Sequence, residues 1–146
     1  MLSSCAASGP VFNSELIKVP DARATLVIYL AGFGKHMNLF VDGQPIGLIR
    51  HNGFVVYNSL PGSYQISAMS RWDDGLPPPP LDVQLTQGKV TYIRYNPKFE
   101  QTRIVAACGE NEEILRVCWR YTDIPAFETV QESLALSELG DLKQSQ

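Results

Sequence analysis

Short runs of alternating apolar and polar residues dominate the chain, and turn-forming residues separate most of them. Alternation with a period of two predicts half-buried β-strands. Four such runs follow one another over residues 37–71, and residues 24–30 (ATLVIYL) are so rich in β-branched and aromatic side chains that we expect a buried strand. Further strands are predicted over 81–86, 88–94, 102–108 and 113–121, so the pattern indicates a mostly β fold.

Asp42-Gly43 predicts the first hairpin, because a type I′ turn needs positive φ at both central residues. With these two residues at the turn, Leu39 would face Ile46 and Met37 would face Leu48. Both pairs are apolar and lie on one face, so turn and alternation predict the same register.

Residues 51–53 fit a three-residue loop with Gly53 in the left-handed position, which would put Phe54 and Val56 on the face of Leu48. Residues 60–63 (Leu-Pro-Gly-Ser) suit a type II turn. A tight hairpin there would spoil the apolar pairing, so we infer either a bulge or a crossing of the chain between two sheets.

The strand predicted over 81–86 alternates cleanly, with Leu85 among its inward positions. A turn at Gln87-Gly88 would then place Leu85 opposite Val90, again apolar on apolar. The full set of inward positions that the alternation predicts for this strand is Leu81, Val83 and Leu85.

Residues 125–139 change period, because Phe127, Val130 and Leu134 recur at helical spacing. Pro125 near the start and Gly140 at the end are the expected asymmetry of a helix.

The predicted organisation is a tether and entry segment (1–23), an antiparallel β-sandwich of the immunoglobulin or prealbumin type with about eight strands (24–122), a C-terminal helix packed on it (123–140) and a disordered tail (141–146).

Composition narrows the function classes. The 146 residues carry a net charge of −3 and 45% apolar residues, which is enough for one domain with a real core. A pI near 5.3 argues against nucleic acid as a partner, because such partners need a clustered basic surface. No apolar run reaches the ~18 residues that a transmembrane helix needs.

Leu2-Ser3-Ser4-Cys5 resembles the lipobox of bacterial lipoproteins, in which a peptidase cuts before a cysteine that is then acylated. The alternative is a chance match, but its place at the terminus before a run of small residues favours lipidation of Cys5. In the Gram-negative sorting pattern, a residue other than aspartate after the cysteine implies the outer membrane, and Ala6 fits.

Cys108 and Cys118 are the other two cysteines, and they lie in consecutive predicted strands. An oxidising periplasm permits a disulfide between them. A tight turn at Glu110-Asn111 would leave Cys118 several residues away from Cys108 along the ladder. Two buried thiols that act as small apolar groups therefore remain the alternative.

Residues 72–80 (WDDGLPPPP) form the one loop of odd composition, and we predict a partner-binding surface there. Its aromatic residue, if exposed, is of the type enriched in binding hot spots, and its prolines hold a stiff extended shape. The alternative is that the prolines only separate two strands. The residues assigned to this predicted site are Trp72, Asp73, Asp74, Pro77, Pro78, Pro79 and Pro80.

Catalytic chemistry finds little support in the sequence. The only histidines, His36 and His51, fall in predicted loops, where we expect both to be solvated. The chain contains no Gly-x-Ser-x-Gly elbow and no phosphate-binding glycine loop, and Asp73-Asp74-Gly75 lacks the further carboxylates of a calcium loop. We therefore expect no enzyme, no cofactor and no metal.

The order of motifs resembles a known family. A lipobox is followed by Val41-Asp42-Gly43 with Ile46-Gly47, by Leu60-Pro61-Gly62-Ser63-Tyr64, by the strand 88–94 and by a C-terminal helix. This order is similar to the bacterial lipoproteins described as domain of unknown function 2846, whose turns small prealbumin-like and PEGA-type sandwiches share. The resemblance implies a lipoprotein facing the periplasm and transfers no catalytic residue.

The expected function is thus that of a non-catalytic lipoprotein of the outer membrane, anchored only by its N-terminal lipid, whose sandwich docks other envelope proteins. The alternatives are a sandwich that binds a small ligand between its sheets and, less favoured, a hydrolase.

Overall fold

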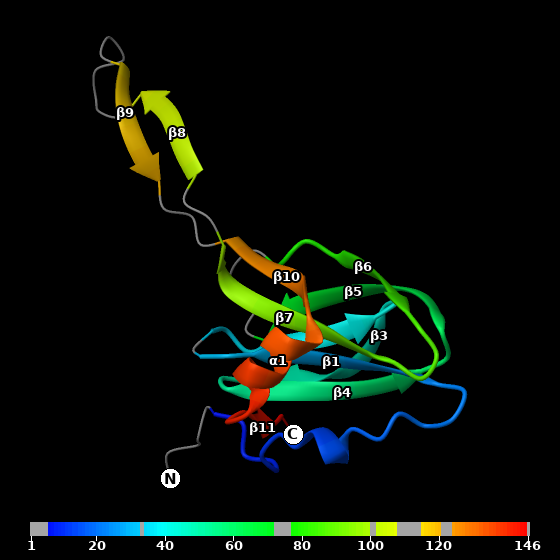
Figure 1. Ribbon diagram of the computed structural model, residues 1–146. Helices are drawn as coiled ribbons and strands as arrows, with labels where there is room; N and C mark the ends of the chain where they lie inside the picture. The colour runs from blue at the N-terminus through cyan, green and yellow to red at the C-terminus, as the bar shows by residue number, and fades with distance from the viewer. Residues whose placement is uncertain are drawn as a thin grey trace.

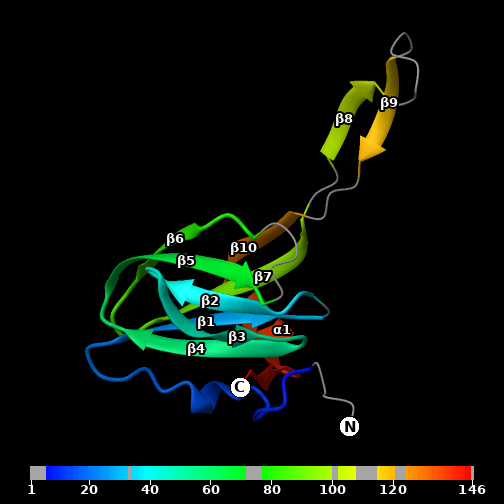
Figure 2. The same cartoon turned by 180° about the vertical axis from the view of Figure 1, so that it is seen from behind.

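The computed structural model describes residues 6–32, 34–71, 77–99, 102–107, 115–120 and 124–145. Two β-sheets pack face to face, and a short helix lies against the outer face of one of them (Figure 1). The view from behind shows the second sheet on the opposite side of the molecule (Figure 2). The expectation of a mostly β sandwich with one helix near the C-terminus is therefore confirmed.

The five-stranded sheet has the strand order β10-β7-β1-β4-β11 and the four-stranded sheet the order β3-β2-β5-β6. The first comprises β1 (Ala24–Leu30), β4 (Gly53–Ser59), β7 (Val90–Phe99), β10 (Ile124–Val130) and β11 (Lys143–Gln144). The second comprises β2 (Met37–Val41), β3 (Gln44–Ile49), β5 (Gly62–Ser70) and β6 (Leu81–Leu85). The five-stranded sheet is mixed, because β1 runs parallel to β7 and β11 runs parallel to β4.

Strand β1 lies in the middle of the five-stranded sheet, and all seven of its residues are buried. Leu26 and Ile28 point toward the four-stranded sheet, whereas Val27 and Tyr29 point to the outer face. A strand covered on both faces needs no polar side, which explains why its sequence is continuously apolar instead of alternating.

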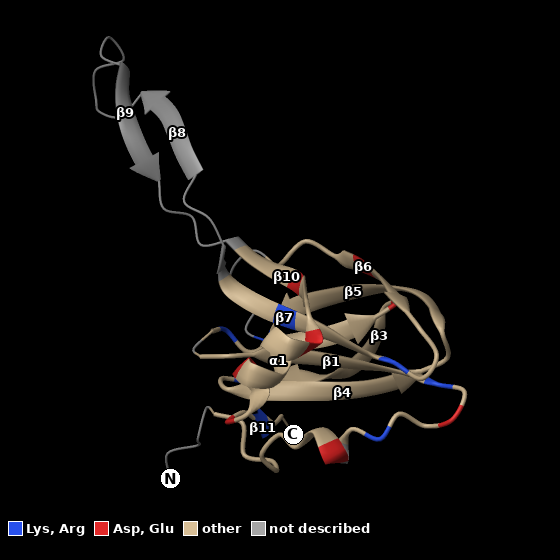
Figure 3. Ribbon diagram, viewed as in Figure 1, with Lys and Arg blue, Asp and Glu red and all other residues tan. Residues whose placement is uncertain are grey.

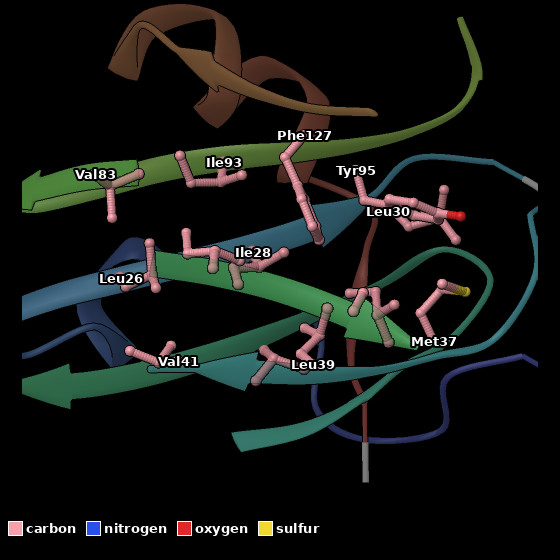
Figure 4. Packing of buried hydrophobic residues seen from close by; sticks show 14 of the residues in the cluster. Leu26, Ile28, Leu30, Met37, Leu39, Val41, Val83, Ile93, Tyr95 and Phe127 are labelled. Carbon is pink, nitrogen blue, oxygen red and sulfur yellow. The ribbon is translucent and has the colours of Figure 1, made fainter. Parts of the chain in front are cut away.

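The space between the sheets is filled by apolar side chains from both of them (Figure 4). Leu39, Ile66 and Leu85 of the four-stranded sheet are as fully buried as Leu26 and Ile28 opposite them. The alternation predicted for β6 is confirmed. Val83 and Leu85 are buried, Leu81 is partly buried against the core, and the two residues between them are exposed.

The first hairpin turns as predicted and then slips by one residue. Asp42 and Gly43 both have positive φ, at 48° and 77°, as a type I′ turn requires. A register shift beyond Phe40 then places Gly47 opposite Leu39 and Ile49 opposite Met37. The predicted pairs Leu39–Ile46 and Met37–Leu48 are therefore wrong, because a β-bulge adds one residue to β3.

The prediction for residues 51–53 is wrong in two respects. Asn52, not Gly53, takes the left-handed conformation, with φ of 49°. The segment carries the chain from the four-stranded to the five-stranded sheet, so β3 and β4 are not hairpin partners. Consequently Phe54 packs on the outer face, whereas Val55 joins the core between the sheets.

Two further connections also cross between the sheets. At residues 60–63 the chain passes from β4 to β5, which confirms the predicted crossing. At Gln87-Gly88 it turns as predicted, with Gly88 at φ of 71°, but it leads from β6 in one sheet to β7 in the other. Leu85 and Val90 are therefore not paired, since β6 pairs with β5 and β7 with β1 and β10.

The predicted helix over 125–139 is correct only in its second half. Ile124–Val130 form β10, which pairs antiparallel with β7, and α1 comprises Glu132–Leu139. Phe127 lies between the sheets and Val130 on the outer face, so these two residues do not share the predicted helical face. A neighbouring strand with an open edge decided the conformation, because local periodicity is a weak constraint beside tertiary pairing.

Strands β8 (Thr102–Ala107) and β9 (Leu115–Arg120) confirm the last two predicted strands. They form an antiparallel ladder of their own that leaves the sandwich where β7 ends and β10 begins (Figure 1).

Residues 6–12 and 142–145, the described residues nearest the two ends of the chain, are part of the fold. Residues expected to be a tether form backbone hydrogen bonds instead, from Gly9 N to Gln144 O at 3.0 Å and from Phe12 N to Leu142 O at 2.7 Å. A 3₁₀ turn, η1 (Ser14–Leu16), follows. The tail expected to be disordered supplies β11 and the buried Leu142. These two predictions are wrong because the segments satisfy each other's backbone groups beside the edge of β4.

We predict that Gly9→Ala releases this N-terminal segment. A Cβ at residue 9 would lie 2.4 Å from the carbonyl oxygen of Gln144, so the two segments must separate. The expected loss is roughly 1–3 kcal/mol of unfolding free energy. It should come with faster hydrogen exchange of the Gln144 amide, which donates to Pro10. Ser8→Ala, at an exposed neighbouring position, is the matched control. Equal stability of the two variants would contradict the docking.

Candidate functional site

The predicted lipidation and disulfide positions fall largely outside the described part of the chain. Cys5 lies outside it, directly before Ala6, which forms a β-bridge with His51. Cys108 also lies outside it. Cys118 is in β9, opposite Ile104 in the ladder with β8. The predicted bond between Cys108 and Cys118 thus stays a prediction, with Cys118 facing a different residue across its ladder.

The predicted partner-binding loop is described only at its second end. Trp72, Asp73 and Asp74 lie outside the described residues, and Pro77–Pro80 lead directly into β6. Of these prolines, Pro78 is buried and the other three are exposed. Pro78 therefore has a packing role, and only its neighbours are accessible to a partner.

The two histidines meet at one end of the sandwich. His36 is buried, with 8% of its surface exposed, so the expectation that it is solvated is wrong. Its ring centroid lies 4.7 Å from that of His51 in an edge-to-face arrangement. The Gly34 amide donates to His51 Nδ1 at 3.0 Å, which leaves Nε2 as the protonated nitrogen when this imidazole is neutral.

Sequence reasoning missed this histidine pair because His36 and His51 were assigned to separate loops. The crossing at residues 51–53 brings the second loop beside the first, as the hydrogen bond from Asn52 N to Gly32 O also indicates. Within the described ranges, no group of three or more histidine, cysteine, aspartate or glutamate side chains is placed to hold a metal ion.

A charged cluster lies beneath the helix, where β1, β7, β10 and α1 meet. Arg94 of β7 donates from Nε to Glu128 of β10 at 3.0 Å and from Nη1 to Glu138 of α1 at 2.6 Å. The Tyr29 hydroxyl of β1 donates to the other carboxylate oxygen of Glu138 at 2.5 Å. Figure 3 shows these charged positions of the outer face gathered around the helix.

Burial and the contacts within the cluster both shift the pKa values of Tyr29 and Arg94. Burial raises the pKa of Tyr29 far above 10, and the hydrogen bond to Glu138 and the charge of Glu138 act in the same direction. Burial alone would lower the pKa of Arg94, but the hydrogen bonds and charges of Glu128 and Glu138 outweigh it and raise that pKa. Each residue of the cluster has a hydrogen-bond partner on another element, so the arrangement serves to fasten α1 to the sheet.

A hollow of about 280 Å³ opens on the outer face beside β4. Phe54 and Val56 of β4 and Ile17 of the N-terminal segment give it an apolar lining. Three amide side chains, those of Asn13, Asn58 and Gln144, supply its polar groups. Asn13 and Asn58 already accept hydrogen bonds, from Glu15 N and Thr25 Oγ1, so their amide nitrogens are the groups left to donate.

A small ligand between the sheets was only an alternative in the sequence analysis, and side chains fill that space. The hollow lies outside them and depends on the docking of both chain ends, which no local pattern indicated.

No helix among the described residues has both the length and the apolar character needed to span a membrane. Comparisons of the chain with protein-family models, with curated proteins and with solved structures returned no match. The resemblance to the lipoproteins of domain of unknown function 2846 therefore stays a prediction.

We predict that Tyr29→Phe lowers the unfolding free energy by about 0.5–1.5 kcal/mol below pH 10, because Glu138 loses one hydrogen bond. The pKa of Tyr29 is raised by folding, so its contribution is complete below its ordinary value of 10 and is lost as pH rises above that value.

The difference in unfolding free energy between wild type and Tyr29→Phe should therefore become smaller above pH 10. Urea unfolding at a series of alkaline pH values measures it. Burial likewise raises the pKa of Tyr95, to about 12, so some alkaline destabilisation persists in the variant. If the difference in unfolding free energy stays constant up to the highest pH, the role assigned to the Tyr29 hydroxyl is wrong.

Proposed function

We propose that this chain is a non-catalytic lipoprotein of the bacterial envelope, held at the outer membrane by a lipid on Cys5, whose β-sandwich docks other envelope proteins. The lipobox-like Leu2-Ser3-Ser4-Cys5 and Ala6 after it supply the anchor and its destination. The order of turns and strands that resembles the lipoprotein family supplies the class of protein.

The observation that carries the proposal is the docking of the chain directly after Cys5. Ala6 forms a β-bridge with His51, the Ala7 amide donates to the His51 carbonyl at 3.2 Å, and Ala7 is 6% exposed. An acylated Cys5 would therefore be followed at once by folded structure. A domain mounted in this way presents a fixed end to the membrane and the rest of its surface to the periplasm.

Docking suits the described polar groups better than catalysis does. The side chains of the charged cluster hydrogen-bond to one another and so fasten α1 to the sheet; these residues are Tyr29, Arg94, Glu128 and Glu138. A catalytic site needs groups that converge on a space for substrate, whereas these groups converge on one another.

A second candidate function, small-ligand binding, is favoured by one observation, the hollow beside β4. Its volume of about 280 Å³ is near the lower end of the range for small-molecule sites. Its apolar lining and amide groups suit an uncharged ligand.

We predict that the full-length precursor partitions with the outer membrane and that Cys5→Ala moves it to the soluble periplasmic fraction. Two or more acyl chains hold a protein firmly, at ~0.8 kcal/mol for each buried CH₂, and the substitution removes all of them. Membrane fractionation with immunodetection is the measurement. Cys108→Ala is the matched control and should stay membrane-bound. If the Cys5→Ala protein still partitioned quantitatively with membranes, the proposed lipid anchor at Cys5 would be wrong.

We predict that Trp72→Ala combined with Pro79→Ser removes partners that crosslink to the wild-type protein in intact cells. Pro79 is exposed and Pro78 buried, so leaving Pro78 unchanged spares the packing before β6. The melting temperature should stay within a few degrees, because a substitution at the exposed Pro79 changes stability little and a docking role for Trp72 requires that its side chain is not part of the core. Pro78→Ser is the contrasting variant, with a clear loss of stability. An unaltered set of crosslinks would remove this loop as a docking surface.

A further inference from the structure

The second half of β4, past its pairing with β11, is an open sheet edge whose residues line the hollow beside β4. Strand β11 pairs with β4 only at Gly53 and Phe54, although β4 continues to Ser59. The N-terminal segment bonds to the far side of β11, and no described strand pairs with β4 past Phe54 on that side. The second half of β4 is therefore an edge strand.

The direction of these backbone groups follows from the hydrogen bonds to β11. Lys143 N donates to Asn52 O at 3.0 Å, and Ser145 N donates to Phe54 O at 2.9 Å. The N–H and C=O of a strand residue point to the same side, and successive residues alternate sides. Val56 and Asn58 consequently present their N–H and C=O to the open edge, while Val55 and Tyr57 bond to β1.

The hollow lies at this edge. Val56 and Asn58 line it, Gln144 of β11 lies at one end, and Asn13 and Ile17 of the N-terminal segment form its far wall. A slot with an open strand edge on one side and apolar and amide side chains around it matches the requirements of an added β-strand. Main-chain hydrogen bonds supply the affinity in this mode, and the pockets for alternate side chains supply the selectivity.

We propose that the edge of β4 from Val56 to Ser59 is a β-augmentation site, which takes an extended, uncharged peptide segment of a partner protein as a continuation of the β11 position. The inference rests on the proposed function, because it names the kind of partner that the envelope module docks. Among the described residues the lining has no charged side chain, so Thr, Val, Ser and Ala fit the incoming strand better than Lys or Glu.

The register of β11 provides a direct experiment on the whole chain. Gln144 lies opposite Phe54 in a parallel pair, so four residues added after Gln146 would run along the edge past Tyr57 and Asn58. The probe is the extension Thr-Val-Thr-Val. The matched control is Pro-Val-Pro-Val, which has the same length but lacks the N–H groups of its first and third residues, the two that this register directs at the carbonyls of Val56 and Asn58.

Amide hydrogen exchange reads out the pairing residue by residue. In the unextended chain, we expect Val56 and Asn58 to exchange faster than Val55 and Tyr57, which are bonded to β1. The Thr-Val-Thr-Val extension should slow exchange at Val56 and Asn58 about tenfold or more and raise the melting temperature, with Val55 and Tyr57 unchanged. The proline extension should do neither.

Two results would overturn the inference. One is equal protection of Val56 and Val55 in the unextended chain, because the edge would then already be occupied. The other is an exchange rate at Val56 and Asn58 that neither extension alters, or that both alter equally. Either result leaves the Cys5 anchor untouched, since fractionation of the Cys5→Ala precursor tests that separately.

Discussion

The burial of β1 on both faces is the constraint on which the rest of the structure depends. One face needs a second sheet to cover Leu26 and Ile28, and the other needs the helix and the N-terminal segment to cover Val27 and Tyr29. Removing either cover would expose side chains that each contribute about 1.5–3 kcal/mol when buried. The chain therefore has three layers at this point, with a strand in the middle layer.

Much of the fold could be predicted from local patterns, because strands and turns are encoded within a few residues. The apolar run of β1, the alternation of β6 and the turn at Asp42-Gly43 all appear where the sequence indicated them. The sheet to which each strand belongs could not be predicted in the same way. The sequence of a tight turn does not show whether the chain returns along its own sheet or crosses to the other sheet, as it does at Gln87-Gly88.

The candidate sites were harder to predict, because tertiary contacts assemble them. His36 and His51 meet through a crossing, and the hollow beside β4 is walled by Ile17 and Gln144, which are far apart in the sequence. The helix predicted over residues 125–130 was wrong for a related reason. Their helical spacing was real, but β7 offered an unpaired edge, and the backbone hydrogen bonds of a ladder outweighed the local preference.

The hydrogen bonds between the two terminal segments also constrain the order in which parts of the domain fold. Gly9 and Phe12 bond to residues 144 and 142, so the first residues of the domain find their partners only after nearly all of the chain is available. Closing so long a loop is entropically costly, and it succeeds only when the intervening sheets already hold the ends together. The segment that is synthesised first is thus fixed last. An acylated N-terminus would remain a free tether through folding and become a rigid mount only when the domain is complete.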